Sequence, residues 1–378
     1  MGLSLETGNV HTLPEILQQP ETWRDTCRRL IAHRDAIRER MAGIASVVLT
    51  GSGSSQFAGE CVRAVLEKEL GIGVEVVDGG ALLMRGAATM PAARPALVVS
   101  LARSGNSPES VGAVSLLIES APEVRHLILT CNGEGGLAKT LPGETVVLDP
   151  RTNDRSLVMT SSFTNLVLAA RFLGLMDDPE RYWRICDALA DMCQELLARY
   201  STILKRVARA DFDRVVYLGS AVGFGAGREC SLKMLEMTAG RVATMAETYL
   251  GLRHGPMSFV NGRTLVVCFL SSDPHLRDYE FDLIRELNRK QLGAMKVLVG
   301  ENIDRDLLME SDHSLEIPGI AGVGDDNAVV LHVTVGQLLA FFRCIEEGLK
   351  PDAPSENGVI NRVVEEFPIY RREGEGKP

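Results

Sequence analysis

Short apolar runs without polar alternation recur along most of the chain, and they constrain its fold more than any other feature. The first half contains the runs SVVLT, PALVVSL, HLILTC and TVVLD, which are separated by helical stretches such as 56–70 and 108–120. Strands that are apolar on both faces and alternate with helices are typical of a parallel sheet covered on both sides. The sequence therefore predicts an α/β fold with doubly wound, mainly parallel sheets flanked by helices.

The same pattern begins again after a long helical segment at about 162–208, in the runs RVVYLGS, TLVVCFLSS, AMKVLVG and HSLEIP. The segment VVLTGSGSSQFAGE matches VVYLGSAVGFGAGRE and places Gly51 opposite Gly219. Because a chain of 378 residues has room for two domains, a duplication is the economical interpretation. We predict an N-terminal helical segment at 1–45, domains at 46–200 and 201–350, and a C-terminal tail at 351–378 that covers the active site.

The overall charge narrows the class of partner. A formal net charge of −10 argues against binding to nucleic acid or to anionic membranes. The longest late run without Asp, Glu, Lys or Arg extends from Asn327 to Phe342, which is shorter than the ~20 apolar residues of a membrane span. The first residues, MGLSLETGNV, lack the basic and apolar regions of a secretion signal. We therefore expect a cytoplasmic protein that binds neither nucleic acid nor membrane.

The cysteines and histidines show no pattern of metal ligands. The chain has eight cysteines and seven histidines, and none of them forms a CxxC, HxH or HxxxH motif. Scattered thiols of this kind are typical of packing residues in a reducing compartment. We expect no metal site and no cofactor. An anionic small molecule remains compatible with the acidic chain, because backbone amides and hydroxyls can hold an anion locally.

A serine- and glycine-rich turn follows the first apolar run, in Gly51-Ser-Gly-Ser-Ser-Gln56. At a strand–helix turn, glycines allow a tight backbone and the helix amides then face an anion. Ser54 and Ser55 are therefore candidate phosphate-binding residues. A dinucleotide site does not fit, because Gln56 replaces the third glycine of that fingerprint. A plain turn without a ligand remains an alternative.

A second polar turn, ARSGNSPES, follows the run PALVVS. Its candidates are Arg103, Ser104, Asn106 and Ser107, because a phosphate uses hydroxyls, turn amides and a guanidinium together. Ser107 alone could be a helix N-cap before a proline at the first helical position. A third hydroxyl cluster, TSS, contains Ser161 and also precedes a helix.

Three charged residues, Glu229, Lys233 and Glu236, lie on one face of the predicted helix GRECSLKMLEMT. They could form an exposed salt-bridge ladder. Alternatively, because this helix is apolar nearly all round, Glu236 could be a base in an apolar cleft, with Lys233 tuning it. His254, in the turn LRHGP, is either a proton carrier or a structural residue.

These motifs resemble the sugar isomerase (SIS) superfamily. RSGNSPES, TSSFTNL, LKMLEMTAG and RHGP look like its double-domain members, and the similarity runs from about 46 to 365. GLRHGPMS and DAPSENGVINRVV are similar to one branch in particular. That branch is known as tagatose-6-phosphate ketose/aldose isomerase and is generally read as galactosamine-6-phosphate deaminase/isomerase. The resemblance implies two tandem SIS domains.

The resemblance also implies residue roles. Ser55, Ser104 and Ser107, with the loop around Arg103 and Asn106, would form the phosphate cradle. Catalysis is implied for three residues of the second half. Glu236 would move the proton between C1 and C2, Lys233 would assist on the same helix, and His254 would open the sugar ring, often from the neighbouring subunit.

The tail departs from the pattern of one relative. Where the isomerase half of glucosamine-6-phosphate synthase has a lysine near the sugar, this chain has Asn361 and Arg362. An arginine stays protonated and forms no Schiff base at neutral pH. Asn361 and Arg362 are therefore expected to contact the site without that chemistry.

The reaction implied by the resemblance is deamination of galactosamine 6-phosphate to tagatose 6-phosphate and ammonia. Because water hydrolyses an imine in that scheme, we also expect a hydrolase. The alternatives are aldose–ketose isomerisation of hexose 6-phosphates and a non-enzymatic sensor of sugar phosphates. The configuration at C4 and the choice of amine or hydroxyl at C2 stay open. A homodimer or higher homo-oligomer with a shared active site is expected.

Overall fold

The computed structural model describes residues 11–141 and 145–370. The predictions made for the first ten residues and for the end of the tail lie outside these ranges. The chain forms two compact units, each made from separate stretches. The first-sheet unit contains residues 25–153, 161–183 and the tail from 360. The second-sheet unit contains the chain up to 24 and residues 154–160 and 184–359.

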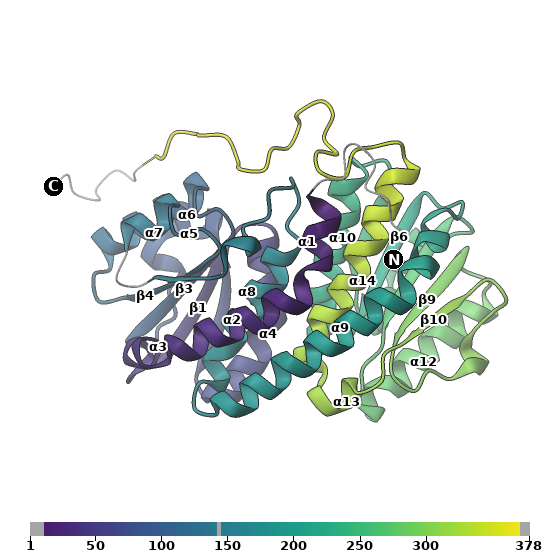
Figure 1. Cartoon of the computed structure of the whole chain (residues 1–378), viewed down its shortest axis with the longest axis horizontal. Coiled ribbons are helices and arrows are strands. Elements are labelled where there is room, and N and C mark those ends of the chain that lie inside the picture. The colour runs from purple at the N-terminus through teal and green to yellow at the C-terminus, as the bar shows by residue number, and fades with distance from the viewer. Residues whose placement is uncertain (1–10, 142–144, 371–378) are drawn as a thin grey trace. The chain divides into compact units, whose positions relative to one another are not determined.

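The first-sheet unit is built on a five-stranded parallel sheet of order β2-β1-β3-β4-β5 (Figure 1). Its strands are β1 (Ser46–Gly51), β2 (Gly73–Asp78), β3 (Ala96–Ala102), β4 (Arg125–Thr130) and β5 (Thr145–Val147). The central strands β1 and β3 are buried along their whole length. Apolar residues on both faces therefore explain why these runs lack alternation.

Helices cover this first sheet. They are α3 (Arg34–Met41), α4 (Ser54–Leu70), α5 (Gly79–Arg85), α6 (Pro108–Ser120), α7 (Gly136–Thr140) and α8 (Ser161–Leu175), with short 3-10 turns η1 (Gly86–Thr89) and η3 (Pro150–Thr152). One apolar core contains Val48 of β1, Val98 of β3 and Leu117 of α6. Helix α4 ends at Gly71, which adopts a left-handed conformation with φ of 66°, as a glycine allows at a C-terminus.

The second-sheet unit repeats this plan with the order β10-β9-β8-β6-β7, all parallel. Its strands are β6 (Arg214–Gly219), β7 (Ala243–Glu247), β8 (Thr264–Phe269), β9 (Met295–Gly300) and β10 (His313–Glu316). Its helices are α1 (Thr12–Leu17), α10 (Val222–Met237), α11 (Tyr249–Leu252), α12 (Pro274–Arg289), α13 (Ile320–Val323) and α14 (Asp325–Glu346), with 3-10 turns η4 (Gly255–Phe259) and η5 (Arg305–Leu307). Two further helices, α2 (Gln19–Ala32) and α9 (Pro179–Ala208), contribute residues to both units.

The duplication is therefore confirmed, and so is the α/β fold class. Each strand of the first sheet has its counterpart five strands later, with the same neighbours. The repeat extends to the backbone at the first turn. Gly53 precedes α4 with φ 57° and ψ −124°, and Ala221 precedes α10 with φ 48° and ψ −119°.

One predicted element is divided. The helical segment expected at about 162–208 is two helices, α8 and α9, and the break falls at Asp178. The Asp178 carboxylate accepts a hydrogen bond from the Arg181 amide at 2.9 Å. An acidic N-cap followed by a proline at the first helical position starts a new helix.

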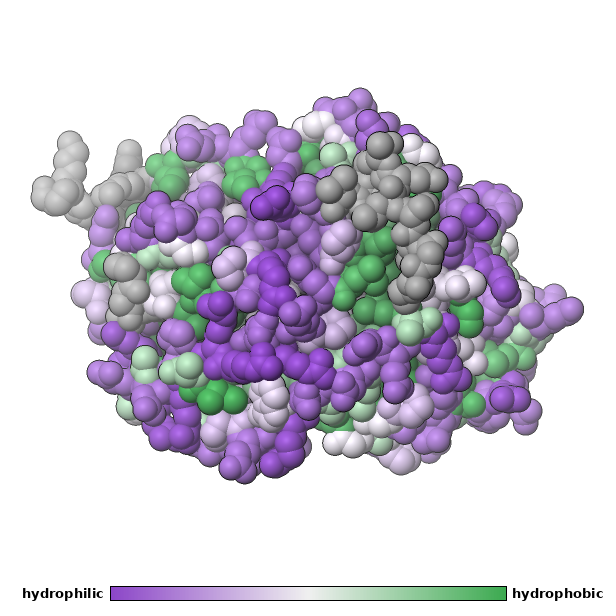
Figure 2. Space-filling model, viewed as in Figure 1, coloured by the Kyte–Doolittle hydropathy of each residue, from purple (hydrophilic) through white to green (hydrophobic). Residues whose placement is uncertain are grey.

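Helix α14 is the longest apolar helix of the second-sheet unit. It is long and apolar enough to cross a membrane by length and composition, but 89% of its most apolar window is buried inside the structure. It packs against α10 and α1 (Figure 1). It is therefore a core helix. The surface face in Figure 2 is mostly hydrophilic, with small hydrophobic patches.

The start of the chain is held by residues near its end. The Asp352 carboxylate accepts hydrogen bonds from the backbone amides of His11 and Thr12, at 3.2 and 2.8 Å, and from the Thr12 hydroxyl at 2.8 Å. Within the second-sheet unit, Asp352 thus fixes the beginning of α1.

Candidate active site

The predicted phosphate loops lie where the order of the strands in the first sheet reverses direction. Strands β2 and β3 flank β1 on opposite sides, so the chain runs in opposite directions after β1 and after β3. Ligands of open α/β sheets bind at this switch point. The first loop leads to Ser54 and Ser55, and the second contains residues 103–107. The fold therefore brings both predicted loops to one edge of the sheet.

The first loop requires its glycines. A Cβ on Gly51 would lie 2.6 Å from Cβ of Ser55 and 3.0 Å from the carbonyl oxygen of Leu101, so no larger residue fits. Gly53 adopts a positive φ of 57°, which a side chain disfavours. This turn starts α4 at Ser54, and both Ser54 and Ser55 are largely buried in its first turn.

The second loop is braced by the β4–α7 loop. The Ser104 hydroxyl accepts a hydrogen bond from the Asn106 amide at 3.2 Å. The Asn132 side chain donates to the Ser104 carbonyl at 2.8 Å, and the Asn106 side chain accepts from the Gly136 amide at 2.9 Å. The Asn106 side chain therefore shapes the loop, while Ser104 is positioned by contacts on both sides.

Ser107 occupies the N-cap of α6, but its side chain makes no capping hydrogen bond. The capping interpretation therefore does not account for this hydroxyl. Arg103 is buried, and one of its guanidinium nitrogens donates to the carbonyl of Arg362 at 2.6 Å. The Arg362 guanidinium in turn donates to Oδ1 of Asn153 at 2.6 Å. Arg362 thus contacts the predicted phosphate loop through its backbone.

The tail beyond 360 lies on the first-sheet unit. The Ile369 side chain approaches Gly112 of α6 so closely that a Cβ on this glycine would lie 2.5 Å from it. The other predicted tail residue, Asn361, is exposed, and its side chain donates to Glu365 at 3.2 Å. Of the two predicted tail residues, only Arg362 contacts a candidate loop among the hydrogen bonds of the described residues.

Ser161 begins α8 and is fully buried. Its carbonyl accepts a hydrogen bond from the Asn165 side chain at 2.8 Å. Helix α8 packs against α4, β3 and β4 of the same unit. The third predicted hydroxyl cluster therefore lies beside the sheet that carries the other two.

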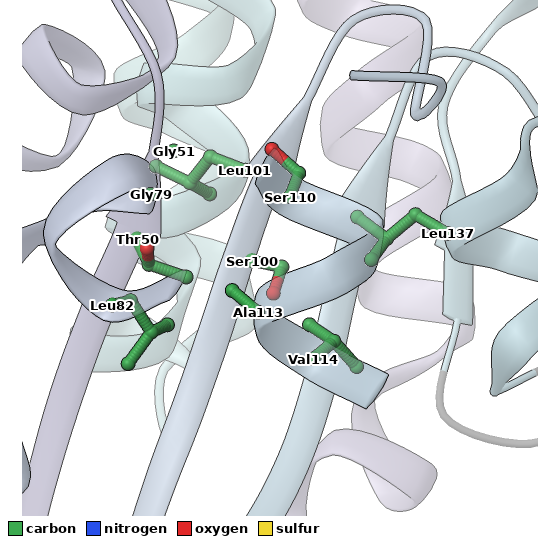
Figure 3. A pocket seen from close by; sticks show the side chains of 10 residues that line it. All are labelled: Thr50, Gly51, Gly79, Leu82, Ser100, Leu101, Ser110, Ala113, Val114 and Leu137. Atoms are coloured by element: carbon green, nitrogen blue, oxygen red, sulfur yellow. The ribbon is translucent and has the colours of Figure 1, made fainter. Parts of the chain in front are cut away.

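A small cavity lies under these loops, between β1, β3, α5 and α6 (Figure 3). The hydroxyl residues Thr50, Ser100 and Ser110 line it together with apolar side chains. Its volume is about 10 Å³, which is room for about one water. It therefore lies below the loops of the switch point and is too small for a phosphate. Among the described residues, the Thr50 hydroxyl is buried without a hydrogen-bond partner. Thr50 was not among the site residues predicted from the sequence, although it directly precedes Gly51.

The second-sheet unit contains a buried cluster of charges on α10. The Lys233 ammonium lies 3.4 Å from a carboxylate oxygen of Glu229 and 2.5 Å from one of Glu236. The side chains of Lys233 and Glu229 are 1% and 0% exposed, whereas that of Glu236 is 22% exposed. The exposed salt-bridge interpretation is therefore wrong. Only Glu236 presents a carboxylate to solvent, and Glu229 is a contact of Lys233 that was not predicted as a site residue.

His254 lies in a different loop of this unit, between α11 and η4, and is exposed. The neighbouring Arg253 anchors the loop through an ion pair with Glu286 of α12 at 2.9 Å. Among the described residues, no hydrogen bond or ion pair joins the His254 ring to Lys233 or Glu236. The structure therefore brings Lys233 and Glu236 together and leaves His254 free to meet another group.

Comparison with known proteins decides the family. An AgaS relative from Streptomyces coelicolor is 37% identical over 380 residues, which cover 97% of each chain. The D-galactosamine-6-phosphate deaminase AgaS of Escherichia coli O157:H7 is 33% identical, with 95% of each chain covered. The chain belongs to the AgaS family. No protein-family model matches it.

A solved structure agrees with this assignment. The AgaS-family chain matches the crystal structure of tagatose-6-phosphate ketose/aldose isomerase from Escherichia coli with a TM-score of 0.84 and 32% identity, over 93% of this chain and 95% of the other. The resemblance to the SIS superfamily is therefore confirmed. Relatives named as a deaminase and an isomerase also confirm that the protein is an enzyme. Neither name supports the expected class of hydrolase, which is not retained.

The cysteines of this AgaS-family chain are packing residues. All eight are buried, and none of them forms a disulfide. Burial raises the pKa of Cys193 and of Cys268 to about 12, so these thiols stay protonated at neutral pH. Within residues 11–141 and 145–370, no three His, Cys, Asp or Glu side chains gather as a metal site would need. Independence from metals remains a prediction.

Proposed function

We propose that this AgaS-family protein converts galactosamine 6-phosphate and water to tagatose 6-phosphate and ammonia. The observation that carries the proposal is the α10 cluster, in which buried Lys233 holds the partly exposed Glu236 carboxylate. The names of relatives that are at least 30% identical over nearly the whole chain support it. Aldose–ketose isomerisation of a hexose 6-phosphate is the second candidate, because the solved relative carries that name.

The phosphate would bind to the first-sheet unit. Ser54 and Ser55 lie in the first turn of α4, where helix amides attract an anion. Ser104 and Ser107 add hydroxyls, and Arg103 adds a positive charge that the tail carbonyl of Arg362 already orients. Hydroxyls and a guanidinium together make charge-assisted hydrogen bonds to a phosphate. Ser161 and Asn106 would support the loops from beside them.

The proton transfer is assigned to Glu236. Its carboxylate would take the proton from C2 of the open-chain sugar and return it to C1, as a positioned general base does. The Lys233 ammonium would hold that carboxylate in place. With an amine at C2, the enolamine becomes an imine, and water releases ammonia and leaves the ketose. With a hydroxyl at C2, the same transfer gives isomerisation.

Ring opening is assigned to His254, which would move a proton between O5 and O1, because histidine exchanges protons near neutral pH. Its exposure is compatible with supply to a neighbouring copy. We therefore propose a homodimer or higher homo-oligomer with a shared site, located in the cytoplasm. The proposed chemistry uses no metal and no cofactor. A sensor without activity is not retained, because the relatives are named as enzymes.

An ammonia-release screen tests the proposal. Purified protein is incubated with galactosamine 6-phosphate, glucosamine 6-phosphate or galactose 6-phosphate, and ammonia and ketose are measured. We expect ammonia and tagatose 6-phosphate from the first substrate, with a kcat/KM at least about tenfold above that for isomerisation of galactose 6-phosphate. Isomerisation without ammonia from either hexosamine phosphate would refute the deaminase assignment and favour the second candidate.

A further inference from the structure

The second sheet has its own switch point, in the place that the duplication predicts. Strands β7 and β8 flank β6 on opposite sides, so the loops after β6 and β8 lie at one carboxyl edge. The alignment of the two halves places Ser220 opposite Ser52 in the first of these loops. The second loop, residues 270–273, precedes a proline at the first position of α12, as the ARSGNS loop does at α6.

The helix that follows each sheet is also repeated, but it begins with a different residue type. Helix α8 follows the first sheet and begins at Ser161, whereas α14 follows the second sheet and begins at Asp325. A carboxylate thus stands where the first half has a hydroxyl. This carboxylate faces the other loops of its own edge, as its hydrogen bonds show.

Asp325 uses the donors that an anion would use. One of its oxygens accepts a hydrogen bond from the Ser271 hydroxyl, and the Ser272 amide donates to both oxygens at 2.8 and 3.1 Å. The Ser271 hydroxyl in turn accepts from the Asp273 amide at 3.0 Å. A loop amide and a loop hydroxyl at a strand–helix junction are phosphate donors elsewhere. Here they are satisfied by the chain itself.

A second carboxylate completes the edge. Glu280 of α12 is fully buried, and one of its oxygens accepts from the Ser271 amide at 2.9 Å. Its other oxygen has no hydrogen-bond partner among the described residues. Burial raises the pKa of Glu280 to about 7. The charge of Asp325 adds to this rise, whereas the Ser220 side chain, the Ser271 amide and Arg277 oppose it.

The cation near this edge is already engaged. The Arg277 guanidinium donates to the Ser271 carbonyl at 2.7 Å. It therefore braces the loop, while Asp325 adds negative charge beside it and Glu280 adds more once it is ionised. A phosphate placed here would meet like charges at short range, which repel strongly where water is excluded.

We propose that the carboxyl edge of the second sheet is an anion site of the same type as the first-sheet cradle, which the chain's own Asp325 and Glu280 carboxylates occupy. Each chain then binds one phosphate, at the first sheet. The proposal rests on the proposed phosphate role of the first-sheet loops. The carboxyl edge of the second sheet then has a structural role. An internal carboxylate takes the place of a ligand there and holds α12 and α14 on the sheet.

Calorimetric titration with inorganic phosphate tests two claims separately: the phosphate role of the first-sheet loops, and the occupation of the second-sheet edge by its own carboxylates. The parent protein is expected to bind one phosphate per chain, and Ser104→Ala with Ser107→Ala is expected to abolish binding. Unchanged phosphate binding in this double variant would show that the first-sheet loops do not bind the phosphate. If the parent protein bound two phosphates per chain and the double variant still bound one, the second-sheet edge would be open to phosphate. This result would overturn the proposal.

The carboxylates of the second-sheet edge are then replaced in the variant that carries Ser104→Ala and Ser107→Ala. Asp325→Ser, which installs the residue type of position 161, combined with Glu280→Gln, is expected to restore about one phosphate per chain. Asp326→Ser with Glu280→Gln is the matched control, because it has the same formal charge change and leaves Asp325 in place, and it should bind none. If the serine variant does not fold, as judged by circular dichroism, Asp325→Asn keeps the shape of the side chain. Absence of phosphate binding in a folded variant without these two carboxylates overturns the proposal.

Discussion

Replacing Lys233 with Met would remove the cation that lies between Glu229 and Glu236 on α10. Met keeps an unbranched side chain of similar length in a position that is 1% exposed. The Glu229 carboxylate, which is 0% exposed and 3.4 Å from the ammonium, would then stay buried without that counter-charge. Removing one partner of a buried ion pair typically costs about 3–5 kcal/mol. Glu236 should add little to this loss, since its side chain is partly solvated.

Urea denaturation followed by circular dichroism measures this loss. We expect Lys233→Met to lower the free energy of unfolding of the second-sheet unit by about 3–5 kcal/mol. Adding Glu229→Gln should restore at least about 2 kcal/mol, because neighbouring substitutions are not additive. The matched control is Lys290→Met, since Lys290 is 51% exposed and 2.7 Å from Glu286, and it should cost less than about 1 kcal/mol.

The outcome also separates stability from catalysis. The double variant should regain stability without regaining activity if Lys233 holds the Glu236 base. A single variant that loses less than about 1 kcal/mol, or a double variant whose losses simply add, would refute the reasoning about the buried pair.

Three further predictions concern single features. Glu236→Gln removes the proton acceptor but keeps the shape, so kcat should fall by about a hundredfold or more with KM little changed; a rate within about fivefold of the parent would move the base elsewhere. Ser104→Ala with Ser107→Ala should raise KM strongly while thermal unfolding stays as in the parent, and an unchanged KM in steady-state assays would show that the cradle is misassigned. The pKa of Glu280 is raised from 4.5 to about 7 in the folded protein. The folded state therefore holds a proton that the unfolded state has lost, so stability falls as pH rises across this window, by about 3 kcal/mol. Denaturation at pH 5 and pH 8 should show a smaller decline for Glu280→Gln, and parallel declines would contradict the assignment.

The fold was predictable because its signals are local. Runs that are apolar on every residue occur only where both faces of a strand are buried, and β1 and β3 are such strands. The repeat of a turn before α4 and α10 could also be read from the sequence, although it allowed Ala221 in a conformation where the first half has Gly53. The break at Asp178 was missed because the apolar pattern continues on both sides of it.

The site was predictable only in part. The serine loops were found because they directly follow strands, and a parallel sheet collects such loops at one edge. The burial of Glu229 and Lys233 could not be read, since α10 is apolar nearly all round and the sequence does not say which face meets α14. The contact of Ser271 with Asp325 joins residues 54 positions apart. Such a pair depends on the order of strands, which no local pattern contains.

The hydrogen bonds from Asp352 to α1 have a consequence for synthesis on the ribosome. Thr12 emerges early, but the carboxylate that holds it is 340 positions later in the chain. At the usual elongation rate of roughly 5–20 residues per second, this delay is about 20–70 s. Throughout that interval, α1 lacks the carboxylate that holds its first residue, and the final stretch of the first-sheet unit, from residue 360, is made later still. Neither unit can therefore be completed before nearly the whole chain has been translated.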